Sequence, residues 1–259
     1  MTDVPAEPPP FLSAKHSPGE ATAAYVFRVG HVFAQTFSIL RRHLLPFLLL
    51  YGVASLILNV PVTFTNQDSA IAEITVACGI ALALYIVLNV FAGAAVVYAA
   101  IDDMRGRPVD MSKASRAALR RFVPVLGVTV AVVVLAILGF ALIVPAAIVI
   151  TVLFVAVPVC LAEGLGPVHS MRRSAQLTKG FRWPIFGLWF TTLITGLIMQ
   201  SALDGLTEPL GGTALSLALQ VAWDTVFGAF VAILTAVTYR DLRVAKEGID
   251  TDQIVTVFD

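Results

Sequence analysis

The hydrophobic positions of this chain form long uncharged runs, and nearly all charged residues fall in the short segments between them. Each run reaches the roughly 20 helical residues that cross a hydrocarbon core of about 30 Å. Only the last run contains a charge, Asp224. Phe122–Ala162 is long enough for two crossings, so we expect a tight hairpin that turns between about Gly139 and Pro145. The runs are Leu44–Val62, Ile74–Ile101, Phe122–Ala162, Trp183–Leu203 and Pro209–Tyr239.

The basic residues lie in alternate connecting segments. Of the 17 Lys and Arg residues, six lie in Asp102–Arg121 and four in Glu163–Arg182, whereas Thr63–Glu73 and Asp204–Glu208 contain none. Cationic loops stay on the cytoplasmic side of a membrane. The pattern therefore predicts six transmembrane helices with both termini in the cytoplasm.

Three basic segments show helical periodicity of their own, with apolar residues every three or four positions and polar residues opposite them. Asp110 is a predicted N-cap, Pro167 suits a first helical turn, and Gly180 is a predicted terminator. Amphipathic helices of this kind lie in the membrane interface. The segments are Val26–Leu44, Met111–Arg121 and Pro167–Lys179.

A proline opens the span after each of these helices, at Pro46, Pro124 and Pro184. The chain therefore reads as three repeats of an interfacial helix and a two-span hairpin, an all-α polytopic membrane fold. Independent basic helices before each span would explain the charges but not the repeated proline. The expected divisions are a disordered cytoplasmic tail 1–22, a membrane domain 23–243 with repeats at about 23–104, 105–164 and 165–243, and a cytoplasmic tail 244–259.

Composition agrees with this class. The chain is 58% hydrophobic and 13% charged, and its mean hydropathy is +0.87, which excludes an ordinary soluble domain. The formal net charge is zero, so charge predicts no nucleic-acid partner. No hydrolase elbow, phosphate loop, paired Cys motif or His zinc spacing is present in the sequence. We therefore expect no enzymatic activity, no cofactor and no metal.

Short motifs in the C-terminal half carry a family resemblance. They are Val157–Gly164 with the following Gly166 and Pro167, Arg173–Gly180, Arg182–Leu188, Tyr239–Arg243 and Lys246–Gly248. Together they resemble the membrane domain attached to some bacterial glycerophosphoryl diester phosphodiesterases, which also occurs alone. The resemblance is strongest over residues 155–248. It implies membrane association and a link to glycerophospholipid metabolism, and we expect a bacterial inner-membrane location. It implies no catalysis, because the relatives' metal-dependent hydrolase is a separate barrel for which this chain has no room.

The basic interfacial helices supply the candidate binding residues. Each Lys or Arg near an anionic bilayer surface contributes about 1 kcal/mol. Glu163 is expected to form a structural ion pair with Arg172, Arg173 or another nearby Arg. The residues expected to contact lipid phosphates are Arg116, Arg120, Arg121, Arg172, Arg173, Lys179 and Arg182.

Asp224 is the candidate intramembrane polar site, because an ionisable residue within a span suggests function by default. The alternatives are a transport or proton-relay site and a packed or water-reaching carboxylate near the outer surface, beside Trp223. Uncharged polar residues within spans either form hydrogen bonds between helices or line a polar pathway. These are Asn59, Asn89, Gln200 and Gln220.

Two functional hypotheses remain. The first is a non-enzymatic scaffold or accessory protein that binds anionic phospholipids and another membrane protein or complex. The second is a small transporter or channel that uses the repeat interface and Asp224. A cavity lined by polar groups favours the second, and a uniformly apolar interior favours the first.

Overall fold

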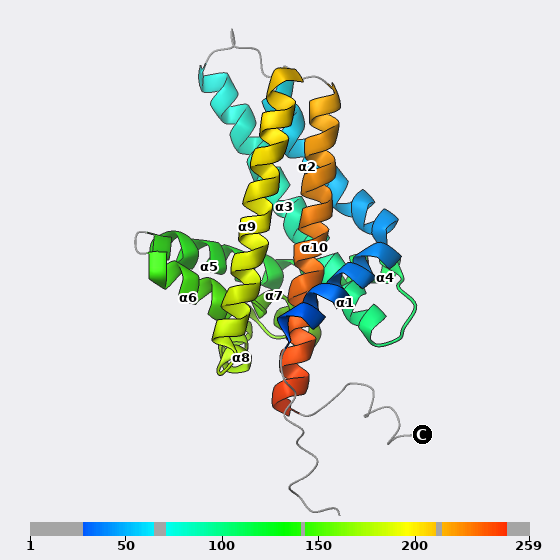
Figure 1. The fold of residues 1–259 in the computed structure, drawn as a ribbon, viewed down its shortest axis with the longest axis vertical. Coiled ribbons are helices and arrows are strands. Elements are labelled where there is room, and N and C mark those ends of the chain that lie inside the picture. Colours follow the sequence, from blue (N-terminus) through cyan, green and yellow to red (C-terminus); the bar gives the residue numbers. More distant parts are fainter. Residues whose placement is uncertain (1–27, 65–70, 141–142, 211–213, 248–259) are drawn as a thin grey trace, which may run out of the picture.

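The computed structural model describes residues 28–64, 71–140, 143–210 and 214–247, and every regular element within these ranges is a helix (Figure 1). The predicted tail 1–22 and residues 248–259 of the predicted tail 244–259 lie outside the described residues. The elements are α1 (Val29–Arg42), α2 (Leu44–Phe64), α3 (Ile71–Met104), α4 (Met111–Arg120), α5 (Phe122–Phe140), α6 (Ile143–Leu153), α7 (Ala156–Glu163), α8 (Pro167–Thr178), α9 (Arg182–Thr207), the short 3-10 helix η2 (Glu208–Leu210) and α10 (Ala214–Glu247).

Four stretches of the described chain are long and apolar enough to cross a membrane. Two further candidates are bent pairs, α1 with α2 at 88° and α4 with α5 at 70°. The predicted all-α class is therefore confirmed, with four to six candidate spans by length and composition. The four stretches are Gly79–Met104, Pro145–Glu163, Arg182–Thr207 and Ala214–Glu247.

The two bends separate basic amphipathic helices from apolar ones. The joints are the single residues His43 and Arg121, each the C-cap of the helix before it. Pro46 and Pro124 lie in the first turn of the next helix, where a missing backbone donor costs little. The sequence therefore places both helix boundaries correctly, because each depends on local signals.

The predicted helix ends around α4 and α8 are also confirmed. The Asp110 carboxylate accepts hydrogen bonds from the backbone N–H of Ser112 at 2.9 Å and of Lys113 at 3.3 Å. The Lys113 backbone bond is the main cause that lowers the pKa of Asp110. Pro167 occupies the first position of α8, and Gly180 has the positive φ of 95° that favours glycine after a helix.

Small residues bring α2, α3 and α10 close together. Tyr51 of α2 is only 3% exposed, and its ring lies against Gly228 of α10. A Cβ at Gly228 would lie 2.8 Å from that ring, and one at Gly93 of α3 would lie 3.1 Å from the Tyr51 hydroxyl. Close approach over small residues is a common basis of helix packing in membranes. Buried alanines of α3 and α10 extend this contact, including Ala92, Ala95, Ala99, Ala229 and Ala236.

The long apolar run forms the expected hairpin, since α5 ends at Phe140 and α6 begins at Ile143. Its orientation is less expected, because it projects sideways from the lower half of the bundle rather than along α9 and α10 (Figure 1). The helix is broken between α6 and α7, which frees backbone carbonyls. Ser174 and Thr178 of α8 donate hydroxyl hydrogen bonds to the Val152 carbonyl at 2.8 and 3.3 Å. The Val152 carbonyl thereby gains hydrogen-bond partners from protein, which apolar surroundings require because no water is available there.

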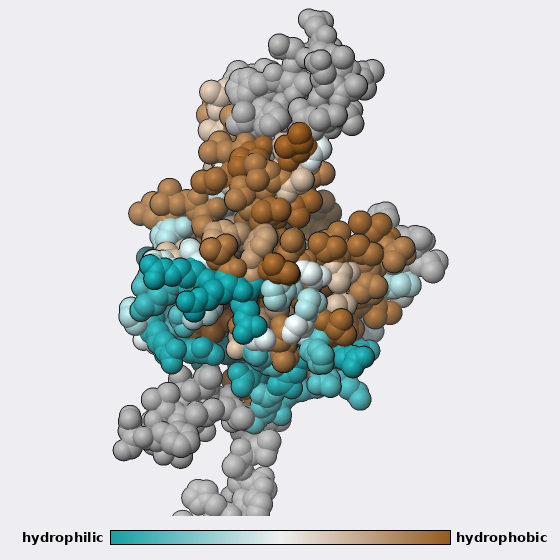
Figure 2. All heavy atoms as spheres, turned by 180° about the vertical axis from the view of Figure 1, so that it is seen from behind, coloured by the Kyte–Doolittle hydropathy of each residue, from teal (hydrophilic) through white to brown (hydrophobic). Residues whose placement is uncertain are grey.

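The surface of the described residues divides by polarity. Figure 2 shows a hydrophobic upper surface, which includes the projecting hairpin, and a band of hydrophilic atoms across the lower end. Large apolar side chains are exposed on several helices, among them Leu49, Ile80, Ile137 and Ile198. A soluble monomer rarely exposes so much apolar surface. This surface is consistent with contact with lipid chains.

Candidate functional site

At the lower end of the bundle, four charged side chains and one tyrosine of α7, α8 and α10 form an ionic cluster, defined as Glu163, Arg173, Tyr239, Arg243 and Glu247. The Arg173 Nε donates to both carboxylate oxygens of Glu163, at 3.2 and 3.0 Å, and its Nη2 donates to Glu247. The Tyr239 hydroxyl donates to Glu163 at 3.1 Å. The Arg243 Nε donates to Glu247 at 2.8 Å. The cluster joins three helices that are far apart in sequence.

Arg173 is the centre of this cluster. Partial burial alone would lower its pKa, but the hydrogen bonds from Arg173 to Glu247 and Glu163 outweigh that cost and raise the pKa of the guanidinium. Arg173 therefore remains charged. The predicted ion pair of Glu163 with a nearby arginine is confirmed, and Arg173 is the partner.

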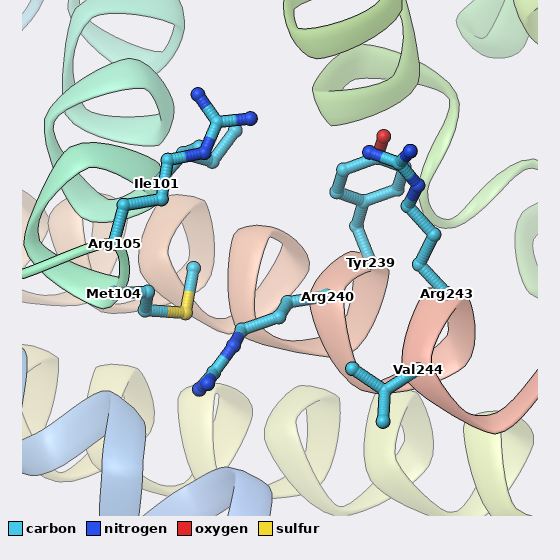
Figure 3. A pocket seen from close by; sticks show the side chains of 7 residues that line it. All are labelled: Ile101, Met104, Arg105, Tyr239, Arg240, Arg243 and Val244. Atoms are coloured by element: carbon cyan, nitrogen blue, oxygen red, sulfur yellow. The ribbon is translucent and has the colours of Figure 1, made fainter. Parts of the chain in front are cut away.

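A small hollow lies beside this cluster, between the C-terminal ends of α3 and α10 (Figure 3). Its volume of about 20 Å³ has room for about one water molecule. The side chains of Arg105 and Arg240 point in different directions, and the Arg243 guanidinium lies beside Tyr239 (Figure 3). The arginines do not converge on one point, so this hollow offers no anion site.

A larger hollow, here called the basic pocket, lies between α4 and the ends of α3 and α7. Its volume is about 480 Å³. Three of the predicted lipid-contacting residues come together there with a fourth cation, and Tyr98 and Leu161 supply a less polar wall. The lining residues are Tyr98, Lys113, Arg116, Ala117, Arg120, Arg121 and Leu161.

The spacing along α4 explains the gathering of cations. Lys113, Arg116 and Arg120 are three and four residues apart, so they share one face of the helix. Ala114 and Ala118 are buried on another face, against the core. Within the described residues, Arg116 and Arg120 form no ion pair or side-chain hydrogen bond, and both are exposed, which leaves their guanidinium groups available to a ligand.

Arg121 is held more rigidly than its neighbours. Its Nη1 donates to the Gly164 carbonyl at 2.6 Å. Gly164 ends α7 with a φ of 69°, and a Cβ there would lie 2.7 Å from the Arg121 guanidinium. Arg121 therefore caps the C-terminus of α7, where a cation is favourable, while it also lines the basic pocket.

The other predicted lipid-contacting residues lie outside the basic pocket. Arg172, Lys179 and Arg182 are exposed on or beside α8 and α9. Arg173 belongs to the ionic cluster. The structure thus assembles Arg116, Arg120 and Arg121 and leaves the remaining four elsewhere, and whether any of them contacts lipid stays a prediction.

A third hollow, here called the membrane cleft, lies between α2, α3, α5, α10 and the α6–α7 break, with a volume of about 430 Å³. The Asn59 amide donates to the Asp224 carboxylate at 3.0 Å, which fixes the carboxylate near one end of the cleft. Phe227 lines the cleft and stacks on Trp223, with ring centroids 5.0 Å apart. The polar groups of the lining are Tyr51, Tyr85, Asn89, Thr129, Asp224 and Thr235.

The predicted interhelical hydrogen bonds are confirmed for some of the polar span residues. Asn59 bonds from α2 to α10, and Gln220 of α10 donates to Thr207 of α9 at 3.4 Å. Gln200 instead bonds within α9, to Asp204. Asn89 lines the membrane cleft. The sequence did not single out Tyr51 or Tyr85, because a tyrosine in an apolar run carries no periodic signal.

Among the described residues, no group of three or more His, Cys, Asp or Glu could hold a metal ion. The expected absence of metal, cofactor and catalysis stays a prediction. A scan against protein-family models, a search of curated proteins and a search of solved structures returned no match. The resemblance to the phosphodiesterase membrane domain is therefore a hypothesis that rests on the motifs alone.

Proposed function

We propose that the chain is a non-enzymatic inner-membrane protein that binds anionic phospholipids in the basic pocket, as a scaffold or accessory subunit of a lipid or envelope process. The observation that carries this proposal is the convergence of Lys113, Arg116, Arg120 and Arg121 on one hollow. Basic pockets between membrane helices suit anionic lipid head groups. Arginine forks bind phosphate oxygens in pairs. The wall made by Tyr98 and Leu161 suits the less polar part of a lipid.

This proposal includes an arrangement for the whole chain. We infer six spans in three repeats, each an interfacial helix and a hairpin, with both termini and the basic pocket in the bacterial cytoplasm. This arrangement requires the α5–α6 hairpin, which projects sideways from α9 and α10 (Figure 1), to align with them in the bilayer. The support is the one-sided distribution of the 17 Lys and Arg residues together with the 88° and 70° bends before α2 and α5. A helix at such an angle to a span can lie along the interface.

Accessibility tests the topology. A cysteine at the exposed residue Glu208 is expected to react with a membrane-impermeant thiol reagent added to intact cells, after Cys78 and Cys160 are replaced by alanine. A cysteine at Lys113 is expected to react only after the cells are opened, because the basic loops stay inside. Labelling at Lys113 in intact cells would refute this orientation.

Neutralising the two free arginines of the basic pocket tests the lipid-binding proposal. The double variant Arg116→Gln and Arg120→Gln is expected to lose about 2 kcal/mol of attraction to anionic lipid, at about 1 kcal/mol per charge. That corresponds to roughly a 30-fold weaker affinity. The measurement is titration of the detergent-solubilised protein with phosphatidylglycerol, followed by native mass spectrometry.

The matched control removes two exposed cations outside the pocket, Arg41→Gln and Arg107→Gln. This control has the same net charge as the pocket variant but is expected to retain bound phosphatidylglycerol. Equal retention by the pocket variant and the parent chain would rule out the basic pocket as the lipid site.

The membrane cleft favours a second candidate function, a small transporter or channel. Its polar lining includes the intramembrane carboxylate of Asp224, and a polar cavity between spans is the feature expected of a transport site. In this alternative the basic pocket would recruit lipid or a partner to the cytoplasmic face, and the solute would pass by way of Asp224.

A further inference from the structure

One acidic side chain, Asp224, is found among the described residues that line the membrane cleft. Among the described residues that line it, none is Lys, Arg or His. Asp224 is half-buried, and the hydrogen bond from Asn59 satisfies only part of its capacity to accept. A carboxylate in apolar surroundings is costly unless it is paired. A positively charged ligand would supply the missing partner.

The aromatic lining of the cleft also suits a cation. Tyr51, Tyr85, Phe154 and Phe227 come from α2, α3, the α6–α7 break and α10, so they surround the cleft from several sides. The face of an aromatic ring attracts an ammonium group, more strongly where water is excluded. Aromatic rings and one carboxylate together form a site for an amine rather than for an anion.

The cleft is elongated, and its two ends differ in polarity. On α10 the lining runs from Asp224 to Thr235, a length of about 16 Å at helical rise. Toward the other end the walls are mostly apolar, with Val97, Val125 and Val157 from three helices, and the Thr235 hydroxyl there donates to the Ala232 carbonyl of its own helix at 2.8 Å. The volume of about 430 Å³ lies in the range of small-molecule sites. This shape accommodates a polar head at Asp224 and an apolar tail beyond it.

We propose that the membrane cleft binds an amphiphile that carries a protonated amine, with the ammonium group at Asp224 and the apolar tail along Val97, Val125 and Val157. The site is independent of the basic pocket, which has the opposite charge and takes the opposite class of ligand. Failure of one proposal therefore leaves the other standing.

Dodecylamine and dodecanol test this proposal, because they share a tail and differ in the cationic group. The full chain in phosphatidylcholine nanodiscs is photolabelled with a dodecylamine that carries a diazirine in its tail, and the labelled peptides are identified by mass spectrometry. Labelling is expected on the peptides that contain Val97, Val125 and Val157. Unlabelled dodecylamine is expected to compete at a concentration at least about tenfold lower than dodecanol, because both head groups can donate a hydrogen bond to Asp224 but only the ammonium also forms an ion pair with it.

In Asp224→Asn the preference for dodecylamine over dodecanol is expected to fall to about one. The matched control is Glu208→Gln, which removes an exposed carboxylate outside the cleft, and it should keep the tenfold preference. If dodecanol competes equally well in Asp224→Asn and in the parent chain, the variant is folded. If Asp224→Asn does not fold, the comparison of dodecylamine with dodecanol in the parent chain tests the proposal. Equal competition by amine and alcohol in the parent chain, as expected if a proton satisfies Asp224, would overturn the proposal.

Discussion

Replacing Glu163 with alanine is expected to lower the free energy of unfolding by about 3 kcal/mol, because the change removes the acceptor that the ionic cluster shares. Arg173 would lose both bonds to Glu163 while remaining charged, and the Tyr239 hydroxyl would lose its acceptor. Breaking a buried ion pair from one side costs about 3 to 5 kcal/mol. The side chains of Arg173 and Glu163 are 29% and 17% exposed, so the lower end of that range applies.

The fully buried thiol of Cys160 provides the measurement. Its reaction with a thiol reagent in detergent, followed against temperature in a background that lacks Cys78, reports opening of the helix that carries Glu163. The control Glu208→Ala removes an exposed carboxylate and should shift the transition little, by less than about 0.5 kcal/mol. An unchanged transition in Glu163→Ala would show that the cluster does not stabilise the fold.

A leucine at Gly228 is expected to force α2 and α10 apart and to cost about 3 kcal/mol, the upper end of the usual cost of overpacking. Even a Cβ at this position would lie 2.8 Å from the Tyr51 ring, and Tyr51 has little room to move because it is only 3% exposed. The same Cys160 assay measures the loss of stability.

Two further variants make this result specific. Gly187→Leu places the same side chain on α9, where a Cβ meets nothing within 4 Å, and it should be tolerated. Tyr51→Ala is expected to destabilise the parent chain but to relieve part of the cost in Gly228→Leu, because the leucine then fills the space of the ring. Simple addition of the two single effects would contradict direct packing of Tyr51 on Gly228.

The helix boundaries were predictable because local chemistry sets them. Asp110, Pro167 and Gly180 act through a few neighbouring residues, and the structure places the ends of α4 and α8 there. The sideways direction of the α5–α6 hairpin was not predictable. Both helices are apolar on all faces, so their sequences contain no periodicity that orients them, and contacts with distant helices decide.

The sequence predicts which site residues share a face of one helix, but not which residues of other helices join them. The period of α4 places Arg116 and Arg120 on one face, but Tyr98 and Leu161 join them through the tertiary fold. The sequence also does not predict that Arg172 and Arg173 have different surroundings. Adjacent residues lie about 100° apart around a helix, so one is exposed while its neighbour is bound between two carboxylates. Asp224 could be identified as an isolated charge in an apolar run. Its partner Asn59 could not be predicted, because it lies on α2, far away in the sequence.

One continuous helix connects the two ends of the molecule. α10 extends over 34 residues, about 51 Å, and carries Asp224 about a third of the way along and Glu247 at its end. Asn59 holds the first carboxylate and Arg173 the second. Because one helix carries both groups, we expect a displacement at the membrane cleft to move the ion pairs at the lower end as well. Occupancy of the cleft is then expected to change the contacts at the opposite end of α10, without any ligand passing through the molecule.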